Sequence, residues 1–92
     1  MIINKRKRTV TSGGVEYGPF SYNQWVVITT LHESQEPVET WKLSKILYGD
    51  EEHEGGVRSL VNRIRSMAEE AGAPDPINTI LGHGYVLSID DE

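Results

Sequence analysis

The most regular hydrophobic pattern in the chain lies between residues 55 and 71. Apolar residues recur there at the spacing of one helix face: Val57, Leu60, Val61, Ile64 and Ala68. With about 100° of rotation per residue, the opposite face and one flank are polar. The opposite face carries Ser59, Asn62, Arg63 and Ser66, and the flank carries Arg58 and Arg65. The pattern therefore predicts an amphipathic helix around residues 55–71.

The outward face of this helix has two interpretations. Amide and guanidinium groups bind base edges and phosphates in the major groove of DNA. A solvated face with ordinary surface arginines explains the pattern equally well, because amphipathic helices with three arginines are common. The helix alone does not decide between them.

The N-terminal part of the chain predicts a hairpin followed by a helix. Short β-branched and aromatic runs flank Ser12-Gly13-Gly14, which indicates a small hairpin over residues 9–17. Ser21 and Gln24 then match a capping box, so we expect a helix that extends to about Glu33.

Two more helices and a second hairpin follow. Thr40 and Gly49 are the start and stop signals of a second helix, and Gly72 ends the Arg-bearing third helix. Two β-rich runs, 77–81 and 85–89, surround a Gly-x-Gly turn and predict a closing hairpin. We expect Trp25 and Trp41 to pack in the core.

This order of elements predicts an α+β domain with a winged helix-turn-helix architecture. An N-terminal β-hairpin, three helices and a C-terminal β-hairpin wing would occupy residues 9–89, with the third helix in the recognition position. Residues 1–8 are expected to form a basic N-terminal tail and residues 90–92 an acidic C-terminal tail.

The formal net charge of −5 argues against a generic nucleic-acid binder, but the charges are unevenly placed. Residues 1–20 carry four basic side chains and one acid, and residues 57–68 carry three arginines and no acid. Residues 69–92 carry six acids and no Lys or Arg. Electrostatic steering responds to the local field, so the basic segments keep nucleic-acid binding open.

The basic segment near the N-terminus also has two interpretations. Lys5, Arg6, Lys7 and Arg8 are most simply a solvated tail. Alternatively, they contact phosphates or enter a minor groove, as some N-terminal arms do.

The composition indicates the size of the domain and the cellular compartment. The 92 residues suffice for one small domain, and the absence of cysteine fits a reducing compartment. The apolar runs are too short to span a bilayer, and no secretory signal is recognised, so we expect a cytoplasmic protein without membrane contact.

An enzyme is not expected. His32, His53 and His83 lack the spacing of a metal motif, and the carboxylates cluster in loops and tails without an apolar pocket sequence. We expect no catalytic residues, no metal and no cofactor. His83, in the closing turn, can hydrogen-bond a phosphate.

Three motifs resemble the DNA-binding domains of OmpR/PhoB-type response regulators. The run from Ile77 to Leu87, with its Thr and Gly-x-Gly-Tyr turn, is similar to that family's closing pattern. Arg63-Ile64-Arg65 is similar to the end of its recognition-helix pattern, and Leu47-Tyr48-Gly49 to its aromatic-Gly pair after the second helix. The resemblance extends from about Val10 to Leu87.

The resemblance implies roles for matching positions. Arg63 would be the main base-reading residue and Arg65 a phosphate or sugar contact. Ser59 and Asn62 would face the groove, while Tyr48 and Thr79 would touch the DNA backbone. With Arg58, Ser66 and His83, these residues make up the candidate DNA-binding set.

The resemblance also implies a protein partner. The loop 49–54 would correspond to the family's transactivation loop, which meets RNA polymerase or its sigma subunit. Its acidic members are Asp50, Glu51, Glu52 and Glu54.

The sequence departs from the family at two places. Leu81 stands where the family often has an Arg that enters the minor groove, and Gly55-Gly56 replaces its usual Arg-Thr. No receiver domain is recognised, so we expect a free-standing domain similar to small phage or accessory regulators.

Two functions are therefore predicted. The first is a sequence-specific, double-stranded DNA-binding transcriptional regulator that reads the major groove with the helix around 55–71, as a homodimer or in tandem. The alternative is a winged-helix interaction module that binds RNA polymerase, another regulator or itself.

Overall fold

Three helices and two small antiparallel sheets form residues 1–88 in a computed structural model of the chain, and these are the residues that the structure describes. The first sheet contains β1 (Ile2–Asn4), β2 (Thr9–Ser12) and β3 (Val15–Tyr17). The helices are α1 (Tyr22–Glu33), α2 (Thr40–Tyr48) and α3 (Glu54–Ala71). The second sheet is the wing, a hairpin of β4 (Ile77–Ile80) and β5 (Gly84–Leu87). The predicted α+β order of hairpin, three helices and hairpin is confirmed.

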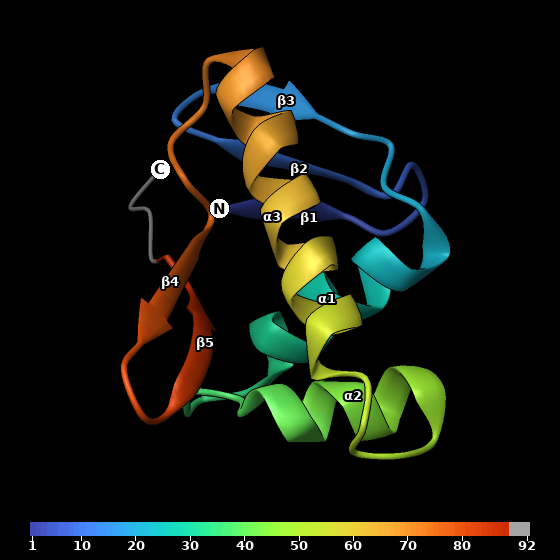
Figure 1. The fold of residues 1–92 in the computed structure, drawn as a ribbon. Helices are drawn as coiled ribbons and strands as arrows, with labels where there is room; N and C mark the ends of the chain where they lie inside the picture. Colours follow the sequence, from blue (N-terminus) through green and yellow to red (C-terminus); the bar gives the residue numbers. More distant parts are fainter. Residues whose placement is uncertain (89–92) are drawn as a thin grey trace.

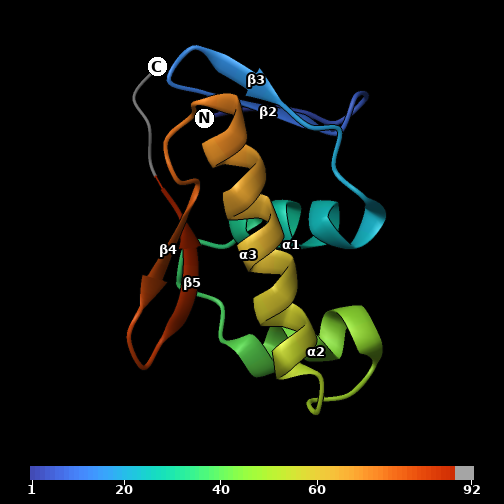
Figure 2. The ribbon, with the colours of Figure 1, turned by 45° about the horizontal axis from the view of Figure 1, so that its top comes forward.

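The long helix α3 runs through the middle of the molecule, and every other element is arranged around it (Figure 1). The sheet β1–β3 lies beside the C-terminal half of α3, whereas α2 crosses near its N-terminal end. The wing lies along one flank of α3, and α1 lies behind it (Figure 2). One face of α3 is thus left uncovered.

The apolar stripe of α3 forms the centre of the core, as its spacing predicts. Val57, Val61, Ile64 and Ala68 are at most 1% exposed, and Leu60 packs against them at the edge. The strands β2, β3, β4 and β5, the helices α1 and α2, and the segment before α1 each add at least one buried side chain to this core. These include Val10, Phe20, Val27, Ile28, Leu31, Leu43, Ile77 and Tyr85.

The helix ends follow the predicted capping signals, with two differences. In the capping box of α1, the Gln24 amide donates to Ser21 Oγ, and the Ser21 amide donates to Gln24 Oε1. Gly49 and Gly72 end their helices in the left-handed region, at φ 84° and 77°. Thr40, however, is the first residue of α2 rather than its cap, and α3 begins one residue before the predicted range.

The N-terminal segment corrects the prediction of a basic tail. Ile2–Asn4 pairs antiparallel with β2, with Ile3 opposite Val10, and residues 5–8 form the turn between the two strands. The Lys7 amide donates to Asn4 Oδ1 at 3.0 Å, and Arg8 takes a left-handed φ of 55°. The four cations therefore lie on an ordered hairpin. The predicted acidic tail 90–92 and the last predicted strand residue, Ile89, lie outside the described residues.

The wing is joined to the helical part through Val38, which precedes α2. The Val38 amide donates to the Tyr85 carbonyl at 2.8 Å, and the Tyr85 amide donates back at 2.9 Å. Gly84 is pressed against this bridge, because a Cβ built there would lie 2.1 Å from the Val38 carbonyl oxygen. This end of the wing is thus fixed to the start of α2.

The two tryptophans have different environments. Trp25 packs against the core and stacks on Phe20, with ring centroids 6.2 Å apart. The core prediction is wrong for Trp41, which lies at the surface, donates from its indole nitrogen to Glu39 and has the Lys42 ammonium 5.5 Å above its ring. Trp41 is on the first turn of α2, where the wing rather than the core is its neighbour.

Candidate nucleic-acid interface

The uncovered face of α3, together with its flank at Arg58, carries most of the predicted DNA-binding side chains. All of them are exposed: Arg58, Ser59, Asn62, Arg63 and Ser66. Because the core stripe occupies the other side of the same helix, this face can enter a groove without any change in packing. It offers guanidinium, amide and hydroxyl groups together, and between Val57 and Ala68 the helix carries no acid.

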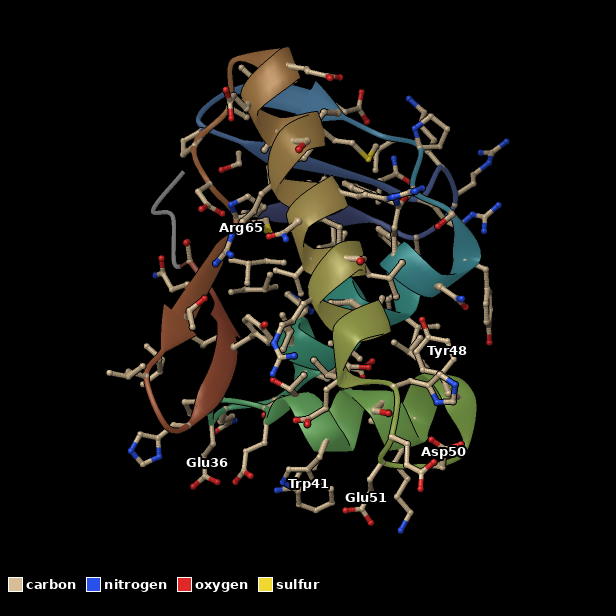
Figure 3. The ribbon with its side chains drawn as sticks, viewed as in Figure 1. Glu36, Trp41, Tyr48, Asp50, Glu51 and Arg65 are labelled. Carbon is tan, nitrogen blue, oxygen red and sulfur yellow. The ribbon has the colours of Figure 1, made fainter. Side chains whose placement is uncertain are left out.

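Arg65 does not belong to this free face, although it comes from the same helix. Its Nη2 donates to the Ile77 carbonyl and to Thr79 Oγ1, both at 2.9 Å. Its Nε lies 3.2 Å from Asp75 Oδ2, so the guanidinium also forms an ion pair. Figure 3 shows Arg65 between α3 and the upper end of the wing. The side chain predicted to contact a phosphate is thus engaged within the chain.

The other flank arginine meets the wing nearer its tip. Arg58 lines a groove of about 300 Å³ between α3 and the wing, together with Thr79 and His83. Arg58 and Arg65 are seven residues apart, or two helical turns, so they lie on the same flank of α3. Leu81, at the turn of the wing, is 93% exposed. The structure therefore brings three predicted site residues, Arg58, Thr79 and His83, around one groove.

The basic turn 5–8 lies on the opposite side of α3 from the wing (Figure 1). Helical rotation places Arg63 on that same side, since it is about 160° around the axis from Arg65. The positive side chains of residues 5–8 and Arg63 thus flank the free face of α3 on one side, and the wing flanks it on the other.

The acidic loop between α2 and α3 is held by its own hydrogen bonds. The buried Ser44 hydroxyl donates to the Asp50 carbonyl at 2.7 Å and accepts from the His53 amide at 2.9 Å. His53 stacks on Tyr48, with ring centroids 4.6 Å apart, and its Nδ1 hydrogen-bonds Asp50 Oδ1 at 2.8 Å. Asp50, Glu51 and Glu52 are exposed on this ordered loop, whose labelled members Asp50 and Glu51 point outward in Figure 3.

Tyr48 explains one of the two glycines that open α3. A Cβ built on Gly56 would lie 2.8 Å from the Tyr48 hydroxyl oxygen, so glycine makes room for the tyrosine ring. Tyr48 is therefore enclosed between His53 and the first turn of α3, with 37% of its surface exposed. Its packing role is established by these contacts, and its predicted contact with the DNA backbone stays a prediction.

The pKa of the Asp50 carboxyl group is lowered by its contacts within the loop. The Glu52 amide, and secondly the His53 ring, stabilise the Asp50 carboxylate and hold its pKa below the ordinary 3.8. A lowered pKa means that this stabilisation is present above pH 3.8 and is lost as the pH falls through the lowered value. We expect the Glu52 amide NMR signal to titrate with a midpoint below 3.8. Asp50→Asn should abolish that transition, and a midpoint at or above 3.8 would contradict it.

Two solved domains have a fold similar to that of this chain. The DNA-binding domain of the response regulator AdeR, solved in complex with an intercistronic region, has a TM-score of 0.71 and 18% identity over 94% of this chain and 90% of its own. The C-terminal DNA-binding domain of RstA from Klebsiella pneumoniae has a TM-score of 0.68 and 23% identity over 94% of this chain and 81% of its own. This chain has the fold of those domains.

The expected likeness to the winged-helix domains of OmpR/PhoB-type regulators is thereby confirmed for the fold. No protein-family model matches the sequence, and no curated protein matches it. Within residues 1–88, no helix is long and apolar enough to cross a membrane.

Three residues outside the predicted site, of which His53 was considered only as a metal ligand, organise the elements around it. Ser44 and His53 hold the acidic loop, and Asp75 holds the base of the wing. Of the three, only Asp75 could have been found from the sequence, because an Asp two residues before a strand can accept a hydrogen bond from the first amide of that strand. Here Asp75 Oδ1 accepts from the Ile77 amide at 3.0 Å.

Proposed function

We propose that this chain is a sequence-specific, double-stranded DNA-binding regulator of transcription that places α3 in the major groove. The observation that carries the proposal is the uncovered face of α3, where Arg58, Asn62 and Arg63 project from a helix whose opposite side is the core. Exposed amide and guanidinium groups on one rigid helix suit direct contact with base edges.

The side chains divide into two roles. Asn62 and Arg63 would contact bases, with Ser59 and Ser66 beside them in the groove. Arg58, Thr79, His83 and Tyr48 would contact phosphates or sugars, which position the protein but carry no sequence information. The basic turn, with Lys5, Arg6, Lys7 and Arg8, would meet the phosphates on the side of α3 away from the wing.

The structure reconciles this proposal with the net charge of −5. The acids Asp50, Glu51 and Glu52 lie on the loop at one end of α3, and Glu69 and Glu70 lie at its other end. Glu54 is the first residue of α3, and from Gly55 to Ala68 the only charged side chains are arginines. A duplex laid across the middle of α3 would therefore meet a locally positive surface.

The solved neighbours add support of a coarser kind. Both are described as DNA-binding domains, and one was crystallised with an intercistronic region. One domain of this size contacts few base pairs, so we propose that two copies bind together, as a homodimer or in tandem.

The test begins with wild-type protein and random-sequence duplex at low salt. We expect weak binding whose logarithmic affinity falls linearly with the logarithm of salt concentration, as phosphate contacts require. Repeated selection from a random duplex pool should then enrich one motif, bound roughly 10³-fold or more tightly than random sequence. Absence of binding at low salt, or a pool that stays random, would overturn the proposal.

The ordered acidic loop favours a second candidate, a contact with a basic protein surface. Asp50, Glu51 and Glu52 lie on a loop held by the hydrogen bonds of Ser44, and Glu54 follows at the first residue of α3, so little entropy would be lost on docking. RNA polymerase or its sigma subunit is the partner we propose for this loop. Co-purification with polymerase, combined with failure to bind random duplex, would make the interaction module the better description.

A further inference from the structure

We propose that Arg65 and Asp75 are a positioning pair that sets the wing against α3 and thereby contributes to DNA specificity without touching DNA. The inference rests on the proposed function, and it departs from the phosphate contact that the sequence motif implies for Arg65. Three contacts of one guanidinium carry it.

The guanidinium joins α3 to the first strand of the wing at two alternate residues, Ile77 and Thr79. Nη2 donates to the Ile77 carbonyl and to the Thr79 hydroxyl, each at 2.9 Å. Ile77 is buried in the core at 1% exposure, whereas Thr79 is exposed. One rigid, planar group therefore determines how β4 leaves the core and where its outer part lies relative to α3.

Asp75 connects the same guanidinium to both strands of the wing at its base. Oδ2 pairs with Arg65 Nε at 3.2 Å, and Oδ1 accepts from the Ile77 amide at the start of β4. Its carbonyl accepts from the Ser88 hydroxyl, just after β5, at 2.9 Å. The ion pair thus closes a ring of contacts around the base of the wing.

The pair also orients a candidate DNA contact. A hydroxyl has one hydrogen to donate and can accept on its oxygen. Because Thr79 Oγ1 accepts from the cationic Arg65, its hydrogen is directed away from the guanidinium, where a phosphate oxygen can accept it. Arg65 therefore acts on DNA through Thr79.

A direct phosphate contact by Arg65 is disfavoured by the same geometry. Its guanidinium is next to the Asp75 carboxylate, so a nearby phosphate would meet a neutralised pair rather than a free cation. Arg58, on the same flank but two turns away, lines a groove that Glu39 and Glu54 also line, but no ion pair of Arg58 is found within residues 1–88. Arg58 is consequently the matched control for a phosphate contact.

The fold should survive loss of the pair, which makes the proposal testable. The other end of the wing remains bonded to Val38, and Ile77 and Tyr85 remain in the core. The lost ion pair is partly exposed, and pairs of that kind contribute little to stability. We expect changes in wing orientation without unfolding.

The decisive variant is Asp75→Asn, because positioning and simple electrostatics predict opposite signs. Removing an acid from a DNA-binding protein should tighten binding, and Glu70→Gln is the control for that effect. If Asp75 positions the wing, D75N should instead weaken binding to the selected site about two- to fivefold, the size of one partly exposed ion pair. Binding to random duplex should not weaken.

Salt dependence separates positioning from phosphate contact. Arg58→Ala should reduce the slope of log affinity against log salt by about 0.9, since one phosphate contact is lost. The charge-balanced double variant R65A/D75N should keep the wild-type slope but lose affinity for the selected site. Thr79→Val should reproduce that loss, and adding it to the double variant should have little further effect.

The outcomes are distinguishable from failure of the proposed function. If wild-type protein binds a selected site and D75N binds it as tightly or more tightly, the positioning pair is refuted while DNA binding stands. A slope reduced by about 0.9 in R65A/D75N would likewise refute it and assign Arg65 to a phosphate. If wild-type protein selects no site, the proposed function is refuted. Faster amide hydrogen exchange of β4 in free D75N than in free wild-type protein would still support the positioning of the wing by Arg65 and Asp75.

Discussion

Arg63→Ala should weaken binding to the selected DNA site by about 1–3 kcal/mol while changing binding to random duplex much less. Arg63 is exposed on the free face of α3, and helical rotation places it on the side away from the wing. A guanidinium in that position can bind one guanine through two parallel hydrogen bonds, and alanine loses both. Competition between selected and random duplexes, measured at one salt concentration, gives the two affinities.

Arg63→Lys is the matched control for this prediction. Lysine keeps the positive charge but loses the planar fork, so it should retain random-sequence binding and still lose most of the specificity. Both variants should unfold at the wild-type temperature, because Arg63 lies outside the core. An equal loss of affinity for selected and random DNA in R63A would make Arg63 a phosphate contact.

Gly84→Ala should lower the free energy of unfolding by about 2–4 kcal/mol, the combined size of left-handed strain and overpacking. Gly84 has a φ of 109°, and a Cβ there would lie 2.1 Å from the Val38 carbonyl oxygen and 2.7 Å from Glu39 Cα. These atoms are backbone, so no side chain can turn aside. The bridge between Val38 and Tyr85 must open, which detaches the wing from the start of α2.

Gly82→Ala separates the two causes. Gly82 also has a left-handed φ, 79°, but a Cβ there would have no heavy atom within 4 Å. It should cost about 1 kcal/mol from conformation alone. Urea denaturation of both variants measures the difference in their free energies of unfolding. Similar midpoints for G82A and G84A would show that the close approach to Val38 does not add to the destabilisation.

The helix α3 and its buried face could be predicted from the sequence, because its 18 residues repeat the helical spacing of apolar positions over several turns. Its buried stripe and its exposed face both agree with the spacing of apolar residues. Periodicity also placed Arg58 and Arg65 on one flank, but it could not say what covers that flank. The partner of Arg65 comes from residues 75–79, whose path depends on how the wing folds back.

Short elements were harder to predict than α3. The strand Ile2–Asn4 has three residues, too few to show an alternating pattern, and four charged residues after it suggested a solvated tail. Trp41 was assigned to the core from its type alone, although the first turn of α2 faces the wing. Gly56 was noted only as a departure from the family's usual Arg-Thr, whereas its missing side chain accommodates Tyr48.

The two faces of α3 share no residues, and this separation has a consequence for engineering. Ser59, Asn62 and Ser66 contribute nothing to the buried stripe formed by Val57, Val61, Ile64 and Ala68. A library randomised at those three outward positions should therefore fold about as often as the parent chain. New target sequences could be selected on this scaffold without compensating substitutions elsewhere.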